Sequence, residues 1–369
     1  MDILALAQKL ISFQTVTGND AEIKNCLEYI QNLLTPCGAL VDICTFDDAS
    51  PVIFARNTDD SHFNALVLGH LDVVPAPKEM FSPVFENGLL KARGALDMKS
   101  FAAVAVNSLA GVIAEKLPLK FGFILSTDEE TGSLSLEAFL KQNPNLTADI
   151  VLDNDVGGDI TKIVARCKNP VYVKLHAKGT AVHGSTPWEG TDANEALFQT
   201  WQNIRKIYPA FSLKTGKPAN TWIDTVHMAT ISGGKVSNII SDEATALLDF
   251  RLTEKSSVQD LSQKLQLCMA DGVSFEIEME SIPVITDETN KTMLSYKKIA
   301  EDVIGQSITF EYIGGATDSR SFYTRGSTLI MHSGTGDGMH APNEYVVFES
   351  VLQIADIQLR FLRELAFKK

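Results

Sequence analysis

Three short apolar runs that each lead into acidic or histidine residues constrain the fold most. They cover residues 65–68, 121–125 and 150–152, and each has the length and composition of a buried strand. A helical stretch at 98–115 lies between the first two runs. The alternation of strand, helix and strand predicts a right-handed α/β unit with a mainly parallel sheet. Because ligands bind beyond the carboxyl ends of the strands in such sheets, the polar residues after these runs are candidates for a functional site.

The pattern of the chain changes at about residue 171 and changes back near residue 285. Apolar and polar residues alternate at 171–176 and 244–252, which is typical of strands. Helical patterns occupy 193–207 and 257–270. Helix and strand signals return at 294–304 and 327–331. The sequence therefore predicts a catalytic domain formed by residues 1–169 and 285–369, split by a smaller α+β domain at 170–284.

Two helices are expected before the first strand. Residues 3–11 have helical apolar spacing, and Asn19 followed by Glu22 predicts a capping box at the start of a second helix.

Composition argues against several kinds of partner. The formal net charge of −14 opposes binding to nucleic acid or to an anionic membrane surface. The longest apolar stretch, residues 101–114, is interrupted by Asn107 and Ser108 and is too short to span a bilayer. The five cysteines are scattered without CxxC spacing, and the first residues carry no export signal. We therefore expect a cytoplasmic protein in a reducing compartment.

Two polar motifs follow the first strand and precede the first long helix. His70 and Asp72 are two residues apart on an extended chain, so the histidine can bind a metal while the aspartate orients its ring. The alternative is a histidine without a metal, whose ring nitrogens have ordinary hydrogen-bond partners, beside an aspartate that only caps a turn. Asp97 follows a glycine-containing turn at the start of a helix, where an aspartate can equally be a simple N-cap.

Three further motifs carry carboxylates or histidine. Glu129 and Glu130 stand side by side at a strand end, so that one can bind metal while the other faces the metal-bound water. Asp153 and Asp155 follow the third strand, and either can supply one more oxygen ligand. His340 lies in a glycine-rich loop. Taken singly, each can also be an exposed turn without function.

Taken together, two histidines and several carboxylates form a ligand set suited to a hydrolytic pair of zinc or cobalt ions. The sequence contains no HExxH, GxSxG or GxxxxGK[ST] motif and no GxGxxG after a strand. Serine, phosphate-loop and dinucleotide-binding mechanisms are therefore disfavoured.

The motifs GHLDVVP, RGALDMKS, STDEETGS and HAPNE resemble, in order and spacing, those of the metal-dependent aminoacylase and carboxypeptidase family, which includes succinyl-diaminopimelate desuccinylase, acetylornithine deacetylase and glutamate carboxypeptidase. The resemblance spans nearly the whole chain and implies a zinc-hydrolase catalytic domain split by a lid or dimerisation domain. It implies that Asp97 bridges two zinc ions, that Glu129 is the general base and that Asp72 orients His70. The implied metal ligands are His70, Asp97, Glu130, Asp155 and His340.

The inserted segment also resembles the family's lid. By this resemblance His183 stabilises the oxyanion, with the lid domain forming a homodimer, and the substrate's carboxylate contacts Asn238, Arg251 and Arg320. Three positions depart from the family pattern: Asp155 stands where deacylases typically carry glutamate, and Ser100 and Ser241 replace a glycine and a proline.

The resulting prediction is a di-metal amidohydrolase that acts on a small N-acyl amino acid. A dipeptidase or aminopeptidase with the same metals is the alternative, because aspartate at position 155 is more familiar in the peptidase branch. A non-catalytic scaffold with the same fold is a third reading, against which the intact Glu129 argues.

Overall fold

A computed structural model describes residues 1–208, 211, 216 and 218–368. Lys369, at the end of the predicted catalytic domain, and residues 209–210, 212–215 and 217 of the predicted lid lie outside the described residues. The chain divides into two compact units. Unit 1 comprises Met1–Ala165, Thr286–Glu311 and Thr317–Lys369, and unit 2 comprises Arg166–Ile285 and Tyr312–Ala316. Residues 166–169, 285 and 312–316, which the division predicted from the sequence assigns to the catalytic domain, group with unit 2.

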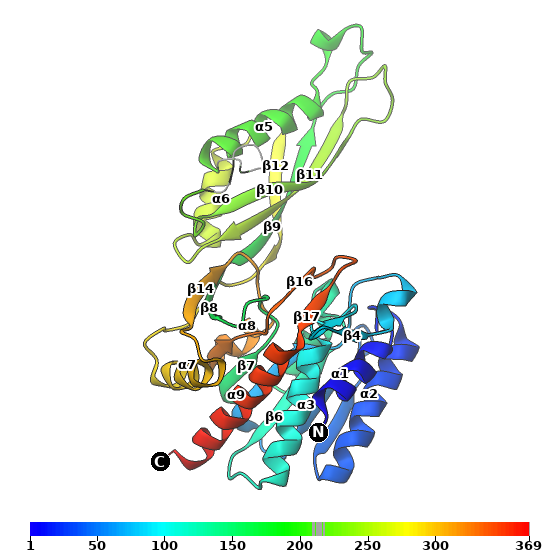
Figure 1. Ribbon diagram of the computed structural model, residues 1–369. Helices are drawn as coiled ribbons and strands as arrows, with labels where there is room; N and C mark the ends of the chain where they lie inside the picture. Colours follow the sequence, from blue (N-terminus) through cyan, green and yellow to red (C-terminus); the bar gives the residue numbers. More distant parts are fainter. Residues whose placement is uncertain (209–210, 212–215, 217, 369) are drawn as a thin grey trace. The chain divides into compact units, whose positions relative to one another are not determined.

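Unit 1 is built on a large sheet with helices around it (Figure 1). Its helices are α1 (Ile3–Ser12), α2 (Asp20–Leu34), α3 (Lys99–Ala114), α4 (Leu134–Gln142), α7 (Lys291–Ile304), α8 (Arg320–Tyr323) and α9 (Phe348–Phe367). Its strands are β1 (Leu40–Cys44), β2 (Val52–Arg56), β3 (His62–His70), β4 (Val84–Glu86), β5 (Leu89–Lys91), β6 (Phe121–Ser126), β7 (Thr147–Asp153), β15 (Thr328–Met331), β16 (Gly336–Asp337) and β17 (Tyr345–Val347). Two strands, β8 (Lys162–Cys167) and β14 (Thr309–Ile313), run across a unit boundary.

The large sheet confirms the predicted parallel arrangement. Its order in the described part of the chain is β1-β2-β6-β3-β7-β15-β8-β13, with β14 paired to β8. The central strands β6, β3, β7 and β15 run parallel to one another, and antiparallel strands complete both edges. The carboxyl ends of β3, β6 and β7 therefore lie at the same edge of the sheet, where the polar motifs begin.

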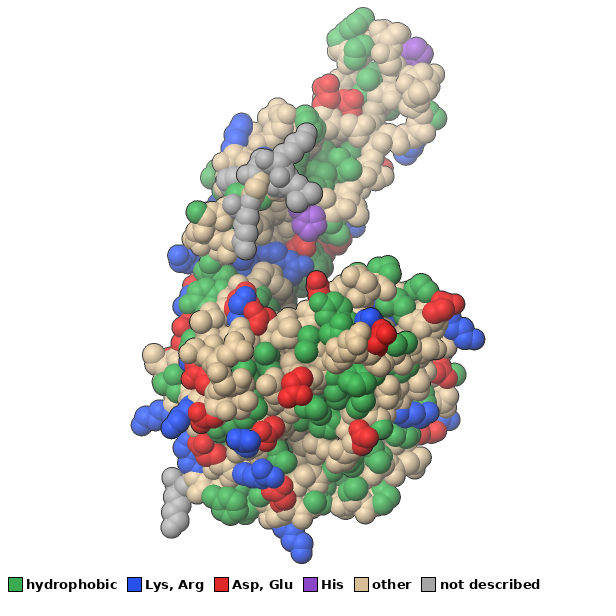
Figure 2. All heavy atoms as spheres, in the orientation of Figure 1, with side chains coloured by type: hydrophobic (Ala, Val, Ile, Leu, Met, Phe, Trp, Pro, Cys, Tyr) green, Lys and Arg blue, Asp and Glu red, His purple; other side chains and the backbone are tan. Residues whose placement is uncertain are grey.

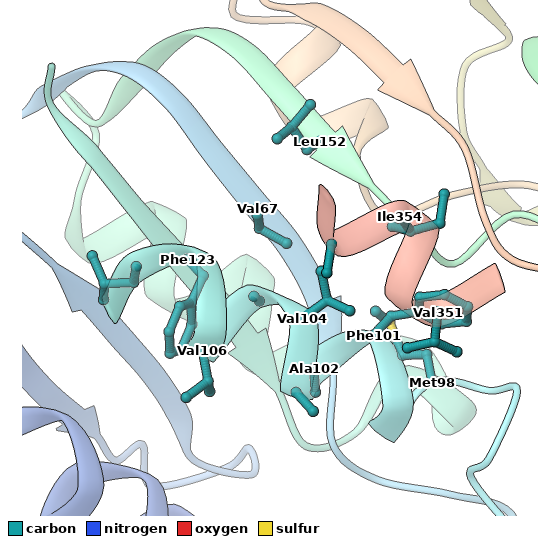
Figure 3. Close-up of a cluster of buried hydrophobic side chains, with 14 of the residues drawn as sticks. Val67, Met98, Phe101, Ala102, Val104, Val106, Phe123, Leu152, Val351 and Ile354 are labelled. Atoms are coloured by element: carbon teal, nitrogen blue, oxygen red, sulfur yellow. The ribbon is translucent and has the colours of Figure 1, made fainter. Parts of the chain in front are cut away.

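The core of unit 1 lies between this sheet and its helices. Helix α3 is apolar on nearly every side, and its residues from Lys99 to Val106 are all buried, which is typical of a helix covered on all faces. Figure 3 shows side chains of α3 gathered with others from the sheet and from α9: Val67, Phe101, Val104, Phe123, Leu152, Val351 and Ile354. Full burial of a side chain such as Phe101 contributes about 1.5–3 kcal/mol to stability.

Unit 2 is an antiparallel sheet whose inner face is covered by two helices. Its elements are β9 (Asn169–Lys178), α5 (Ala193–Ile207), β10 (Thr225–Gly233), β11 (Glu243–Leu252), α6 (Val258–Gln266), β12 (Val273–Glu280) and β13 (Val284–Ile285). The four-stranded sheet has the order β10-β11-β9-β12. Alternate residues of β9 and β11 are buried against α5 and α6, as the period of two in the sequence predicts.

One local prediction is wrong. Helix α2 begins as expected after Asn19, but no capping box forms, because the Asn19 side chain makes no capping hydrogen bond. Its Nδ2 donates instead to the carbonyl of Gln14 at 2.9 Å, and Glu22 accepts the backbone N–H of Gln14 at 3.0 Å. The two side chains fix the preceding turn rather than the end of the helix.

Two observations describe the surface and the helices. Acidic and basic side chains are interspersed over the face of unit 1 that Figure 2 shows. Within the described part of the chain, no helix has the length and apolar character needed to cross a membrane.

Candidate active site

The site lies where three parallel strands of unit 1 end. His70 is the last residue of β3, and Asp153 is the last residue of β7. Strand β6 ends at Ser126 and is followed by a short 3₁₀ turn, Glu129–Thr131, which presents two glutamates. A loop before α3 and the connection between β16 and β17 deliver Asp97 and His340 to the same place.

Two groups of potential metal ligands form there. In the first, His70 Nε2 lies 3.0 Å from Asp97 Oδ1 and 3.7 Å from Asp155 Oδ2. In the second, His340 Nε2 lies 3.0 Å from Asp97 Oδ2 and 3.0 Å from Glu130 Oε2. The two oxygens of Asp97 thus face different histidines, as a carboxylate that bridges two ions must do.

The donor set fits a pair of divalent metals. Zinc bonds of about 2.0–2.2 Å place two tetrahedral ligand atoms roughly 3.3–3.6 Å apart. The four distances in the two groups, 3.0–3.7 Å, bracket that spacing. Imidazole and carboxylate are the ligands of hydrolytic metal pairs, and Asp97 supplies the shared one.

The electrostatics of the carboxylates point the same way. Burial, with the nearby carboxylates of Asp155, Asp318 and Glu130, raises the pKa of Glu129 to about 9. Burial and Asp97 raise the pKa of Glu130 to about 7. Burial and the acidic neighbours of Asp155 raise its pKa to about 6. Buried carboxylates this close together resist ionisation unless cations lie among them, which bound divalent ions provide.

Asp72 holds several of these groups in place. Its backbone carbonyl lies 3.0 Å from His70 Nδ1, so the other ring nitrogen faces the ligand group. Its carboxylate is fully buried and accepts hydrogen bonds from the backbone N–H groups of Glu129 (3.1 Å) and Glu130 (3.2 Å) and from the hydroxyl of Thr17 (2.8 Å). One side chain therefore connects the ends of β3 and β6.

The structure brings Asp155, rather than Asp153, into the first ligand group. The Asp153 carboxylate is used elsewhere: it accepts hydrogen bonds from the hydroxyls of Thr317 and Ser319 and from the N–H of Asp155. Asp153 thus fastens the segment before α8 to the end of β7.

His340 has an unusual backbone conformation. Its φ is +61°, in the left-handed region that non-glycine residues rarely adopt. Such conformations concentrate at functional sites, where surrounding contacts maintain them.

The remaining predicted residues are divided between the units. Arg320 starts α8 in unit 1, with its guanidinium 4.0 Å from the Asp318 carboxylate. His183 and Asn238 are neighbours in unit 2, where the N–H of Gly184 donates to the Asn238 carbonyl at 2.8 Å. Arg251 makes a two-pronged ion pair with Asp249, at 2.8 and 3.0 Å.

Sequence reasoning missed two acidic residues that organise the site. Asp318 lines the pocket beside Glu129 and accepts a hydrogen bond from Ser133 at 2.5 Å. Glu344, buried behind Asp97, pairs with Arg93. Glu344 lies in the HAPNE motif, but its partner is 251 residues away in the sequence, so no local pattern indicates the contact.

Comparisons with known proteins identify the family. The model of Peptidase family M20/M25/M40 matches residues 66–364. Succinyl-diaminopimelate desuccinylase of Pseudoalteromonas translucida (strain TAC 125) is 25% identical over 392 residues, covering 99% of each chain.

Solved structures share the fold. An M20 family metallo-carboxypeptidase from Sulfolobus solfataricus superposes with a TM-score of 0.81 at 18% identity, covering 99% of both chains. Aminopeptidase PepT from Bacillus cereus ATCC 10987 gives a TM-score of 0.79 at 16% identity, covering 99% of this chain and 98% of that chain. The chain therefore belongs to Peptidase family M20/M25/M40 and is a metal-dependent hydrolase of amide or peptide bonds.

Proposed function

We propose that this enzyme removes the acyl group from a small N-acyl amino acid, in the manner of a deacetylase or desuccinylase, with two zinc ions. The observation that carries the proposal is Asp97, whose two carboxylate oxygens each lie 3.0 Å from a different histidine, beside the half-buried Glu129. The similarity to a desuccinylase over 99% of the chain supports an acyl amino acid as substrate.

The roles of the residues follow from their positions. When bound, a metal pair polarises the substrate's carbonyl and lowers the pKa of water, and cobalt can substitute for zinc in such chemistry. His70, Asp97, Glu130, Asp155 and His340 hold the ions. Glu129 takes the proton from the attacking water and passes it to the leaving amine, while Asp72 keeps the ring of His70 turned toward the site.

Residues outside the metal cluster bind the substrate in this proposal. His183 donates to the developing oxyanion, and Asn238, Arg251 and Arg320 hold the free carboxylate. An arginine suits that task because its planar fork matches a carboxylate. Arg251 must exchange the carboxylate of Asp249 for that of the substrate, since the two now form an ion pair.

The test is hydrolysis of a panel of N-acetyl amino acids, N-succinyl amino acids and dipeptides by zinc- or cobalt-loaded protein. Cleavage should be abolished by a chelator and by Glu129→Gln, whereas metal content should be unchanged in that variant. Glu137→Gln is the matched control, because Glu137 is an exposed glutamate in nearby α4. Full activity in Glu129→Gln would refute its role as the base.

A dipeptidase or aminopeptidase is the second candidate. Two observations favour this candidate: Asp155 stands where deacylases typically carry glutamate, and the solved structures that share the fold include an aminopeptidase. Release of amino acids from dipeptides, with acyl amino acids untouched, would decide for this candidate. Two bound metals without hydrolysis of any substrate class would instead favour a non-catalytic scaffold.

A homodimer formed through unit 2 is part of the proposal. Strand β10 lies at the edge of the unit 2 sheet, and Ile231 on that strand is 62% exposed. An open sheet edge with apolar side chains is a template for pairing with a second copy. Ile231→Lys should give a monomer in light scattering, whereas Leu267→Lys, at an exposed apolar residue off this edge, should not.

We place the enzyme in the cytoplasm. The described residues contain no disulfide bond, which fits a reducing compartment. Recovery of the protein with a cytoplasmic marker after cell fractionation tests this location, and recovery with exported proteins would refute it.

A further inference from the structure

We propose that Glu344 is a positioning residue that fixes the bridging carboxylate Asp97 and the His340 loop in one geometry suited to two metals. The inference rests on the proposed di-metal function. Glu344 touches neither ligand group through its own oxygens; it acts through the backbone of the loop that carries Asp97.

Glu344 saturates its carboxylate with donors from residues 93–97. Oε1 accepts the backbone N–H groups of Leu96 at 2.9 Å and Asp97 at 3.1 Å. Oε2 accepts the N–H of Gly94 at 3.1 Å and the guanidinium of Arg93 at 2.5 Å. Four donors thus converge on one side chain that is only 1% exposed. The loop before α3 is wrapped around this carboxylate.

The same side chain is tied to the second histidine. Glu344 lies four residues after His340, immediately before β17. Arg93, already paired with Glu344, donates its second nitrogen to the carbonyl of Ala341 at 3.3 Å. The backbone N–H of Ala92 donates to the Glu344 carbonyl at 3.3 Å, and Tyr345 of β17 pairs with Lys91 of β5. The loops of Asp97 and His340 are therefore joined through Glu344 and Arg93.

The distance between the two ligands depends on this junction. Asp97 Oδ2 and His340 Nε2 lie 3.0 Å apart, although they come from loops 243 residues apart in the sequence. A bridging carboxylate has to present each oxygen to a different ion, so a small rotation of the Asp97 backbone disturbs both ion positions. Residues that orient metal ligands typically alter metal affinity 10–100-fold when they are replaced.

A glutamine cannot replace Glu344. It has the same shape, but its NH₂ group must face either the N–H groups of Leu96 and Asp97 or those of Gly94 and Arg93. Two donors would then lose their acceptor, and Arg93, which is 2% exposed, would lose its counter-charge.

The experiment compares Glu344→Gln with Glu349→Gln, which removes an exposed carboxylate five residues further along the chain. Zinc affinity is measured by competition with a chromogenic chelator, and the visible spectrum of the cobalt-loaded protein reports the coordination geometry. Circular dichroism of the metal-free proteins checks the fold. We expect Glu344→Gln to weaken zinc binding 10–100-fold and to change the cobalt spectrum, and Glu349→Gln to change neither.

Each outcome is decisive. Wild-type affinities and spectrum in a folded Glu344→Gln overturn the inference. If Glu344→Gln does not fold, Arg93→Lys is measured instead, because lysine keeps the positive charge but cannot reach both Glu344 and Ala341. An unchanged cobalt spectrum in Arg93→Lys likewise overturns the inference. A wild-type protein that binds fewer than two ions contradicts the proposed function itself, which is a separate result.

Discussion

Replacing Asp153 by alanine should destabilise unit 1 more than any other single loss of a carboxylate from β7. Its side chain is 2% exposed and accepts hydrogen bonds from the Thr317 hydroxyl, the Ser319 hydroxyl (2.5 Å) and the N–H of Asp155 (2.8 Å). Thr317 and Ser319 are themselves buried. Alanine leaves two buried hydroxyls and the partly buried N–H of Asp155 without their acceptor.

The expected cost follows from that count. A buried donor without an acceptor costs about 1–3 kcal/mol, and rotation of the two hydroxyls toward other acceptors recovers part of the loss. We therefore expect Asp153→Ala to lower the free energy of unfolding by about 3–5 kcal/mol. Asp153→Asn retains an oxygen for the Asp155 N–H but turns an NH₂ group toward the hydroxyls of Thr317 and Ser319. Because these hydroxyls can rotate and accept from that group, the substitution should cost only about 1–2 kcal/mol.

Urea unfolding of the metal-free proteins, followed by circular dichroism, measures the difference. The matched control is Asp149→Ala, because Asp149 lies on the same strand with its side chain 56% exposed and pairs only with the half-exposed His62 in the described ion pairs. An exposed pair of this kind contributes little. Equal destabilisation by Asp153→Ala and Asp149→Ala would refute the reasoning.

Three further predictions concern the site and its surroundings. Asp72→Asn should weaken zinc binding 10–100-fold in chelator competition, because it removes the carboxylate charge 3.4 Å from His70 Nδ1 and leaves one oxygen for the N–H groups of Glu129 and Glu130; wild-type affinity would contradict this. Zinc at 1,000 times its dissociation constant should stabilise the protein by about 4 kcal/mol, so the thermal midpoint must rise above that of chelated protein, and an unchanged midpoint would exclude a preformed site. Burial lowers the pKa of His332 to about 4. The His332 ring therefore stays neutral in the folded protein at pH values where the same ring in the unfolded chain, below about pH 6.5, takes up a proton. Stability should therefore fall by up to about 3 kcal/mol between pH 6.5 and pH 4, and this part of the profile should flatten in His332→Gln when urea unfolding is measured across that range; parallel profiles would argue against a neutral His332.

Much of the architecture could be read from local patterns. The apolar runs predicted β3, β6 and β7, and the residues at their ends predicted which side chains would meet, because the carboxyl ends of parallel strands share one edge. Helix α5 begins and ends where its spacing predicted. These features depend on the period of hydrophobic residues, which a single sequence displays.

Contacts between distant segments could not be read in this way. The choice between Asp153 and Asp155 depends on Thr317 and Ser319, which lie more than 160 residues later. The ion pair of Arg251 was within reach of sequence reasoning, because Asp249 is two residues away on the same face of a strand. The resemblance to the family predicted a substrate contact for Arg251, and the neighbouring Asp249 was not considered.

The position of β15 has a consequence for how the chain acquires its shape. Strands β7 and β8 follow one another in sequence, yet β15, from residues 328–331, lies between them in the sheet. The position between β7 and β8 can be filled only after residues 328–331 have left the ribosome, and His340 follows them. Pairings between segments so far apart are slow to form. A nascent chain that already carries His70, Asp97, Glu130 and Asp155 therefore keeps an open sheet until residues 328–331 are synthesised.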